Sequence, residues 1–199
     1  AALDAAGAAE PPATKGGKKE EEEEEEEGGD GEEAGGEQCQ ALDEALQAKA
    51  AEIRREITAD AKGSGKPSLV VGICGSSEPE NPDTEELVRQ TARQLQSLRP
   101  DAVFLTCGEE GVQTAWAQSC TEATHLFHLR PRGMKSGLRP GEDLVGGESE
   151  SEWRAIFAHV GDVYLCFEGA DGDQDVTFVG EGVAEVKIAA ARGAAVVPM

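Results

Sequence analysis

The sequence predicts an α/β protein built on a doubly wound parallel sheet, and three observations predict it. Short apolar runs without polar alternation recur along residues 68–199, as in strands buried on both faces of a parallel sheet. Stretches with helical periodicity separate these runs. Glycine follows most of the runs, as in the turns at strand ends. Strands alternating with helices form one sheet, covered on both faces through right-handed crossovers.

The first 37 residues differ in composition from the rest. They hold 14 acidic and 3 basic residues, including the unbroken glutamate run from Glu20 to Glu27. Such a segment buries too little apolar surface to offset its ordering entropy, so we expect a disordered acidic tail. We favour a linker over a partner-binding or solubilising tail. The predicted organisation is this tail (1–37), a short leading helix with a linker (38–67) and the α/β domain (68–199), which we expect to continue beyond residue 199.

Each element is predicted from its own pattern. The leading helix covers 41–57, where an apolar stripe should pack on the domain. Its residues are Leu42, Leu46, Ile53 and Ile57. The predicted strands are 69–74, 102–106, 124–129, 162–167 and 195–198. Residues 130–147, rich in glycine, are predicted to be a long connection without regular structure.

Four further helices are predicted from start and stop signals. Asp83 should cap the first, with Glu86 at the reciprocal position, and Pro100 should stop it. The second opens at Gly111, the third at a capping box of Ser149 and Glu152, and the fourth spans 183–192 before a C-cap at Gly193. The predicted inward stripes are Leu87, Thr91, Leu95 and Leu98 in the first helix, Val112, Ala115, Trp116, Ser119 and Cys120 in the second, and Trp153, Ile156, Phe157 and Val160 in the third.

Charge and length indicate which partners to expect. The net charge of −22 should repel nucleic acid and anionic membranes, and no apolar run approaches the ~20 residues that span a bilayer. We therefore expect no nucleic acid and no membrane as partners, and a cytoplasmic protein. A homodimer is a possible assembly. The five cysteines lack metal-site spacing and should be reduced thiols, with a metal or disulfide role as the alternative. The histidines receive no role, and no metal or cofactor is expected.

Glycines at strand ends predict a ligand site. In a doubly wound sheet, ligands bind outside the carboxyl ends of the strands. The residues expected there are Gly75, Ser76, Ser77, Gly108, Gly169, Gly180 and Gly182. Glycine lets the backbone approach a ligand, and free N–H groups at a helix start favour an anion. The sequence has neither a Gly-x-Ser-x-Gly elbow nor a Gly-x-Gly-x-x-Gly turn after its first strand, which disfavours serine hydrolase and dinucleotide sites.

A basic stretch follows the third predicted strand. Arg130, Arg132, Lys135 and Arg139 occur with no acidic residue among them. Guanidinium groups bind phosphate through paired hydrogen bonds, so Arg130 and Arg132 are candidate phosphate ligands. The alternative is a solvated loop that pairs with nearby acids.

Three segments resemble a known family. They are Glu152-Trp153-Arg154, the run from Asp162 to Gly169, and Gly180 to Glu185. Together they resemble the cytokinin-activating phosphoribohydrolases, formerly called lysine decarboxylases, and the Rossmann-like nucleotide-binding superfamily around them. The resemblance covers about residues 68–199. It implies a Rossmann-like domain in which Arg154 holds a sugar phosphate and Glu185 orients or activates water for hydrolysis of the N-glycosidic bond of a nucleoside monophosphate.

The sequence departs from the family pattern at three places. Glu168 stands where the pattern has proline, and residues 170–179 form an acidic insertion. Val183 replaces a threonine, and Glu185 comes three residues after the glycine, where the pattern has four. The aspartates of the insertion should weaken the binding of a monophosphate. Two functions follow: an enzyme acting on a nucleotide or phosphorylated ribose derivative, or a non-catalytic nucleotide-sensing module of a larger protein.

Overall fold

A single parallel sheet organises the molecule. The computed structural model describes residues 33–59, 68–168 and 183–199, with the backbone alone for 33–42, 183 and 184. Within these residues, six strands pair in the order β4-β3-β2-β1-β5-β6, and every pair is parallel. The strands are β1 (Val70–Gly75), β2 (Val103–Thr106), β3 (His125–Pro131), β4 (Glu142–Gly147), β5 (Val163–Phe167) and β6 (Ala195–Pro198). The prediction of a Rossmann-like, doubly wound sheet is confirmed.

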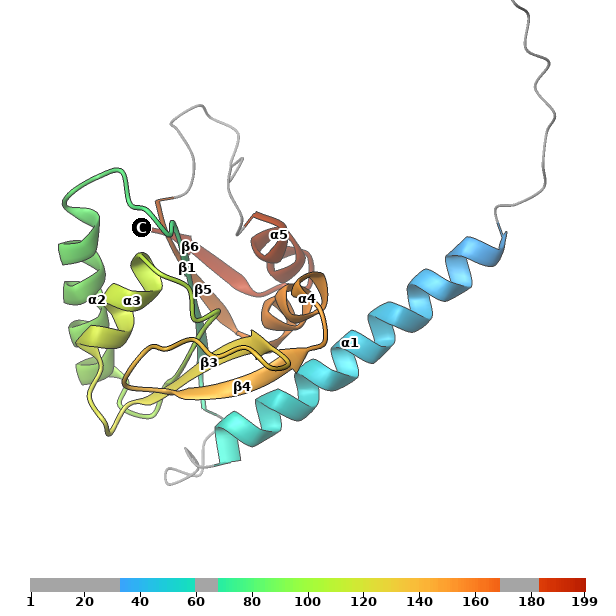
Figure 1. The fold of residues 1–199 in the computed structure, drawn as a ribbon, viewed down its shortest axis with the longest axis horizontal. Coiled ribbons are helices and arrows are strands. Elements are labelled where there is room, and N and C mark those ends of the chain that lie inside the picture. The colour runs from blue at the N-terminus through green and yellow to red at the C-terminus, as the bar shows by residue number, and fades with distance from the viewer. Residues whose placement is uncertain (1–32, 60–67, 169–182) are drawn as a thin grey trace, which may run out of the picture.

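Helices cover both faces of the sheet (Figure 1). They are α1 (Glu33–Ala59), α2 (Thr84–Leu98), α3 (Val112–Ser119), α4 (Glu150–Val160) and α5 (Val183–Ala191). Helices α2 and α3 pack on one face, around Trp116 and Phe104. Helices α1, α4 and α5 pack on the other, around Trp153, Phe157 and Tyr164. The sheet therefore separates two apolar cores, as its continuous apolar strands predict.

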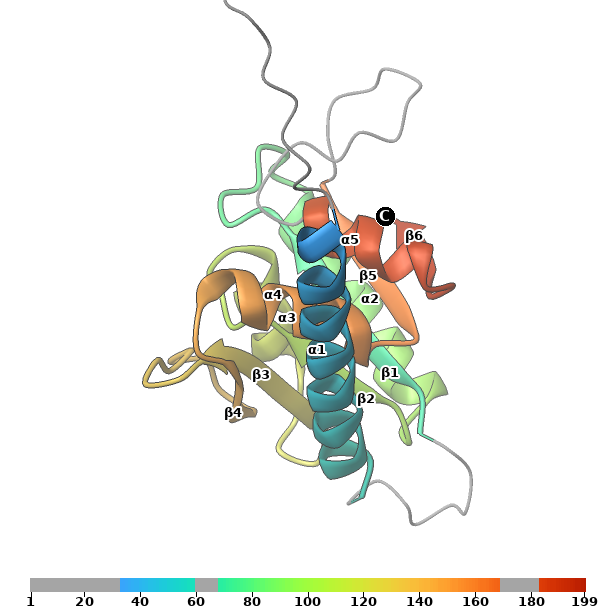
Figure 2. The same ribbon diagram turned by 90° about the vertical axis from the view of Figure 1, so that its right-hand side faces the viewer.

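The leading helix is longer than predicted and lies along the domain. Helix α1 begins at Glu33, so residues 33–37 of the expected tail are helical, and it ends at Ala59. Ile53 and Ile57 are buried in the core that α4 shares, and Figure 2 shows α1 crossing in front of that layer. The predicted packing of this helix on the domain is confirmed. The rest of the tail (1–32), the linker 60–67 and the insertion 170–179 lie outside the described residues.

Two predictions about the elements are wrong. Residues 142–147, expected to belong to an irregular connection, form the edge strand β4 beside β3. At this outer position four of its six residues are partly or fully exposed, so β4 lacks the continuous apolar run that marks a buried strand. In α2, Val88 and Ala92 face the sheet, whereas Leu87 and Leu98 are 42% and 75% exposed. The small side chains of Val88 and Ala92 let α2 approach the sheet closely. The predicted stripe was wrong because it was assigned to the larger leucines.

The predicted helix ends are partly confirmed. The hydroxyl of Ser149 accepts a hydrogen bond from the Glu152 amide at 3.3 Å, and Gly193 adopts a φ of 89° after α5. Asp83 precedes α2 as predicted, but its side chain makes no capping hydrogen bond. The side chains predicted to face inward from α4 are all buried.

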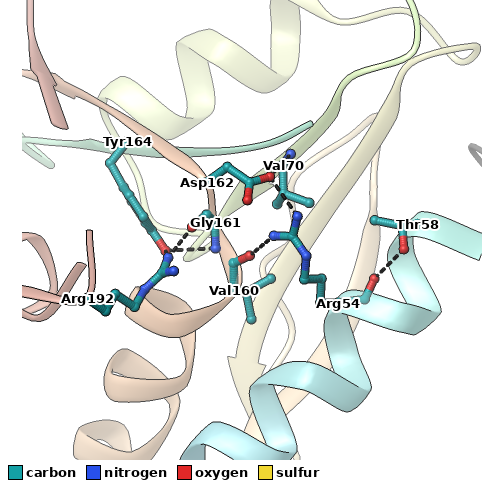
Figure 3. A network of polar contacts seen from close by, with 8 residues as sticks. All are labelled: Arg54, Thr58, Val70, Val160, Gly161, Asp162, Tyr164 and Arg192. Atoms are coloured by element: carbon teal, nitrogen blue, oxygen red, sulfur yellow. Dashed lines mark hydrogen bonds and ion pairs between the residues drawn. The ribbon is translucent and has the colours of Figure 1, made fainter. Parts of the chain in front are cut away.

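A polar network fastens α1 and α5 to the amino edge of the sheet (Figure 3). Arg54 of α1 donates to the Val160 carbonyl and to Asp162, both at 2.7 Å, and Asp162 also accepts the Val70 amide at 3.0 Å. Arg192, just after α5, donates to the Ala158 carbonyl at 2.6 Å and to the Gly161 carbonyl. The network sets the positions of α4 and α5, which carry the residues described next.

Candidate functional site

The carboxyl edge of the sheet is where this topology places a ligand. The strand order runs outward from β1 through β2 to β4, then resumes on the other side of β1 with β5. The two crossover directions diverge between β1 and β5, and ligands of such sheets bind in the resulting crevice. The ends of β1, β2, β3 and β5 therefore delimit the candidate site.

Arg154 and Glu185 meet at this edge. Arg154 projects from α4 and Glu185 from the first turn of α5, and Nη1 of Arg154 donates to Oε1 of Glu185 at 3.1 Å. Their side chains are only 16% and 3% exposed. The residues that the family resemblance singled out, far apart in the chain, thus form one buried ion pair.

Further carboxylates surround the Arg154 guanidinium. Nη2 lies 3.0 Å from Glu150 on the same helix and 3.4 Å from Glu109, which follows β2. Burial lowers the pKa of Arg154, but the charges of Glu185 and Glu109 outweigh it and raise that pKa overall. Arg154 is therefore a permanent cation. Sequence patterns could not select Glu109, because Arg154 is 45 residues away along the chain.

One oxygen of Glu185 remains available. Oε2 is buried and has no hydrogen-bond partner among the residues that the structure describes. A buried carboxylate oxygen without a donor is unfavourable, and such a group needs a water, an ion or a ligand hydroxyl. Glu185 also lies in the first turn of α5, where the helix dipole favours negative charge. Glu185 can therefore hold the Arg154 guanidinium with Oε1 and accept a proton or a hydrogen bond with Oε2.

Arg130 completes this group beside Trp153. Its Nη1 donates to the Cys107 carbonyl at 2.8 Å. The guanidinium carbons of Arg130 and Arg154 lie 5.8 and 5.2 Å from the centre of the Trp153 ring. Both distances fall in the range of cation–π attraction. Trp153 was predicted as a core residue, and it also holds two cations near each other despite their repulsion.

The loop between β2 and α3 approaches Arg130 closely. Gly108 has a φ of 66°, and a Cβ there would lie 2.5 Å from Cβ of Ser136 and 3.1 Å from Cδ of Arg130. Glycine is therefore required at this position for both conformation and space. The prediction that Gly108 lies at the carboxyl edge agrees with this geometry, and the ligand role assigned to it stays a prediction.

The turn after β1 is held by protein groups. The Ser76 carbonyl accepts the Val112 amide at 3.1 Å, and the Ser76 hydroxyl bonds to the backbone of Glu78. A Cβ on Gly75 would lie 2.7 Å from Val112, so the turn packs tightly against α3. Ser77 is exposed. These groups lie at the predicted edge, but part of their hydrogen-bonding capacity is already used.

Glu168 bonds to the loop that leads into α2. Its carboxylate accepts the amides of Glu80 and Asn81, both at 2.9 Å, and the hydroxyl of Thr84. Burial raises the pKa of Glu168, but these donors outweigh it and lower that pKa. Glu168 has a left-handed φ of 51°, which proline could not adopt. The departure from the family pattern at this position therefore supplies a carboxylate that fastens the loop before α2 to the end of β5.

Other predicted site residues make contacts away from the Arg154–Glu185 pair or lie outside the described residues. Arg132 pairs with Glu148 at 2.7 Å on the surface, the two side chains being 67% and 64% exposed. An exposed arginine paired with a nearby acid is what the solvated-loop alternative describes for Arg132. Arg139 donates to the carbonyls of Leu138 and Gly141 at 3.1 Å. Gly169, Gly180 and Gly182 lie outside the described residues.

Thiols and a histidine lie beneath the edge. Cys74, Cys107, Cys120 and Cys166 are free and buried. Burial, followed by the charges of Glu109 and Glu185, raises the pKa of Cys107. His128 is fully buried, with Nδ1 2.7 Å from the Thr106 hydroxyl and Nε2 3.2 Å from the Pro140 carbonyl. In the described ranges, His, Cys, Asp and Glu form no group of three able to hold a metal ion.

Comparisons with known proteins find likeness in fold. No family model and no curated sequence matches the chain. The structural genomics target TM1055 aligns over 64% of this chain and 72% of its own, with 20% identity and a TM-score of 0.49. DNA processing protein A from Helicobacter pylori aligns over 65% of this chain and 64% of its own, with 16% identity and a TM-score of 0.46. At these identities each likeness concerns the fold alone.

The exclusion of nucleic acid is wrong. It rested on the net charge of −22, yet the Helicobacter pylori protein, which shares this kind of fold, is described as binding single-stranded DNA. Net charge sums the whole chain, whereas a phosphate backbone meets only a local surface. Here half of the net negative charge lies in residues 1–37, and basic residues cluster after β3. As for membranes, no helix in the described ranges is long and apolar enough to cross one.

Proposed function

We propose that residues 68–199 form a Rossmann-like domain whose carboxyl edge binds a nucleotide or phosphorylated ribose derivative and hydrolyses its N-glycosidic bond. The observation that carries this proposal is the buried Arg154–Glu185 pair at 3.1 Å. Burying two charges is unfavourable unless they are well paired, so their presence at a ligand edge favours a functional role. The family resemblance assigns the same two residues to the same chemistry.

The geometry suggests how the reaction would proceed. Oε2 of Glu185 lacks a partner among the described groups and would accept a proton from a water molecule aimed at C1′ of the ribose. The C1′–N bond breaks, the water oxygen bonds to C1′, and the released proton reaches the departing base. The products are ribose 5-phosphate and the free base. Arg154, held as a cation, would stabilise the sugar phosphate, and Arg130 beside Trp153 would supply a second positive charge.

A sensing module is the second candidate, and a specific observation favours it. Arg154 already contacts Glu185, Glu109 and Glu150, so a ligand phosphate must compete with carboxylates for it. Glu168 likewise occupies two backbone amides, those of Glu80 and Asn81, in the loop before α2. A ligand that binds by displacing these groups would rearrange the edge without any bond being broken.

One assay separates the two candidates. The intact chain is incubated with a panel of nucleoside monophosphates, and free base is measured by chromatography while affinity is measured by calorimetry. We expect base release that is abolished in Glu185→Gln. The matched control is Glu150→Gln, since Glu150 also contacts Arg154 but its side chain is 70% exposed. Saturable binding without release would select the sensor, and the absence of both would refute the nucleotide proposal.

A further inference from the structure

Three cysteines form a row across the strands beneath the candidate site. Cys74 and Cys166 are direct register partners on β1 and β5. On the other side of β1, Gly72 pairs with Leu105, and the same register continued places Cys107 beside Cys74. All three side chains belong to the core that α1, α4 and α5 cover. They therefore project from the same face of neighbouring strands.

The backbone geometry of Cys74 and Cys166 suits a covalent bond. Neighbouring strands lie about 4.7–4.9 Å apart, and disulfides join Cα atoms about 4.4–6.8 Å apart. The closure of a disulfide would thus require rotation of side chains rather than movement of strands.

We propose that Cys74 and Cys166 are a redox modification site, at which a small peroxide oxidises the pair to a disulfide that ties β1 to β5. The bond would lie one residue before Gly75 and two residues before Glu168, at the junction where the candidate site opens. This inference does not depend on which nucleotide, if any, the edge binds.

The chemistry needs only hydrogen peroxide as co-reactant. The Cys166 thiolate attacks one peroxide oxygen, the O–O bond breaks, and hydroxide leaves with a proton to become water. The sulfenic acid on Cys166 is then attacked by the Cys74 sulfur, the S–S bond forms, and a second water leaves. Two thiols and one peroxide thus give one disulfide and two waters, the sulfurs being oxidised and the peroxide oxygens reduced.

The surroundings select the reacting pair. A hydrogen bond from the Cys74 thiol lowers the pKa of Cys166, which favours Cys166 as the nucleophile. Burial raises the pKa of Cys107, and so do the charges of Glu109 and Glu185. The pKa of Cys74 is raised as well, first by its hydrogen bond with Cys166, so Cys74 and Cys107 should both remain protonated and Cys166 should be the thiol that attacks the peroxide. Exposures of 8% at Cys74 and 3% at Cys166 restrict the reaction to small oxidants and make it slow.

Peptide mapping tests the proposal. The reduced full chain is treated with hydrogen peroxide, its remaining thiols are blocked, and it is digested and analysed by mass spectrometry without reductant. We expect a peptide pair joined through Cys74 and Cys166, lighter by two hydrogens, reversed by dithiothreitol, and about tenfold more abundant than any other linked pair. Dominant links to Cys107 or Cys39, or oxidation of Cys166 only to sulfinic acid, would overturn the proposal.

Variants keep the test decisive. In Cys74→Ser the sulfenic acid on Cys166 cannot be resolved by its neighbour, so labelling by dimedone should rise about tenfold. Cys120→Ser is the matched control, because Cys120 is buried in the opposite core, where burial raises its pKa to about 12. The control should form the same bond as the natural sequence. Circular dichroism confirms that each variant is folded, and unchanged labelling in folded Cys74→Ser would count against the pair.

Discussion

The two edges of the sheet use arginine in opposite ways. At the amino edge, Arg54 and Arg192 donate to backbone carbonyls (Figure 3). Arg54 also pairs with Asp162, whose carboxylate accepts the Val70 amide as well. At the carboxyl edge, Arg154 faces side-chain carboxylates, and Oε2 of Glu185 is left without a partner among the described residues. An arginine that donates hydrogen bonds to backbone carbonyls joins secondary-structure elements together. An arginine paired with a carboxylate whose second oxygen lacks a donor leaves that oxygen able to bind a ligand or a water molecule.

This contrast has measurable consequences for stability. Changes at the amino edge should lower the free energy of unfolding and leave the chemistry of the carboxyl edge alone. Changes to the Arg154–Glu185 pair at the carboxyl edge should alter the chemistry and change the free energy of unfolding little. The expected losses below run from the largest to the smallest.

The largest loss is expected from Tyr164→Phe. The Tyr164 hydroxyl is fully buried, accepts the Gly161 amide at 2.9 Å and donates to the Phe157 carbonyl at 2.6 Å. Its removal leaves two buried backbone groups without a partner, which should lower the free energy of unfolding by about 2 kcal/mol. Urea denaturation followed by circular dichroism measures the change. A loss below about 0.5 kcal/mol would show that the amino edge does not depend on this hydroxyl.

A smaller loss is expected from Arg54→Met. Methionine keeps an apolar stem but loses the bonds to Val160 and Asp162, at a side chain that is 33% exposed. We expect about 1.5 kcal/mol from urea denaturation. The control is Arg55→Met, because Arg55 is exposed and makes only a 3.4 Å contact within its own helix. Equal losses in the two variants would mean that the arginine network does not hold α1 in place.

The next effect is a fall in stability at acidic pH that we attribute to His128. Burial lowers the pKa of His128 below its ordinary value of 6.5, although the Pro140 carbonyl and Asp143 oppose this. The unfolded chain then binds a proton more readily than the folded one. Stability should be constant well above pH 6.5 and fall as the pH drops below it.

The loss attributable to His128 should develop as the pH falls from about 7 to about 5, because the unfolded chain takes up the proton first. His128→Asn should flatten this slope, and His125→Asn, at a less buried position on the same strand, should retain it. Thermal melts across the pH range provide the measurement. A slope that is unchanged in His128→Asn would assign it to other groups.

The smallest loss of stability is expected from Glu185→Gln. The amide keeps an acceptor for Arg154 and removes a buried charge, and Arg154 retains Glu109 and Glu150, so the free energy of unfolding should change by less than about 1 kcal/mol. Base release, in contrast, should disappear. A loss of about 3 kcal/mol or more would place Glu185 with the structural arginine partners of the amino edge.

The sequence was informative wherever structure follows from neighbouring residues. The inward stripe of α4, the cap at Ser149 and the positive φ at Gly193 all depend on periodicity or local turn chemistry. The orientation of α2 was wrong because contact with the sheet, rather than the largest apolar residues, selected Val88 and Ala92. Strand β4 was missed because an edge strand has one neighbour and need not be apolar.

For the candidate site, the sequence by itself determined the parallel sheet, the glycines at its strand ends and, through a resemblance, the choice of Arg154 and Glu185. The tertiary structure alone decided that these two meet at 3.1 Å, that Glu109 joins them, and that Glu168 bonds to the hydroxyl of Thr84, 84 residues away. Periodicity and turn preference act over a few residues, so the sequence displays them directly. The partner of a buried charge is whichever group the fold brings within hydrogen-bonding distance, and that distance exists only once the sheet has formed.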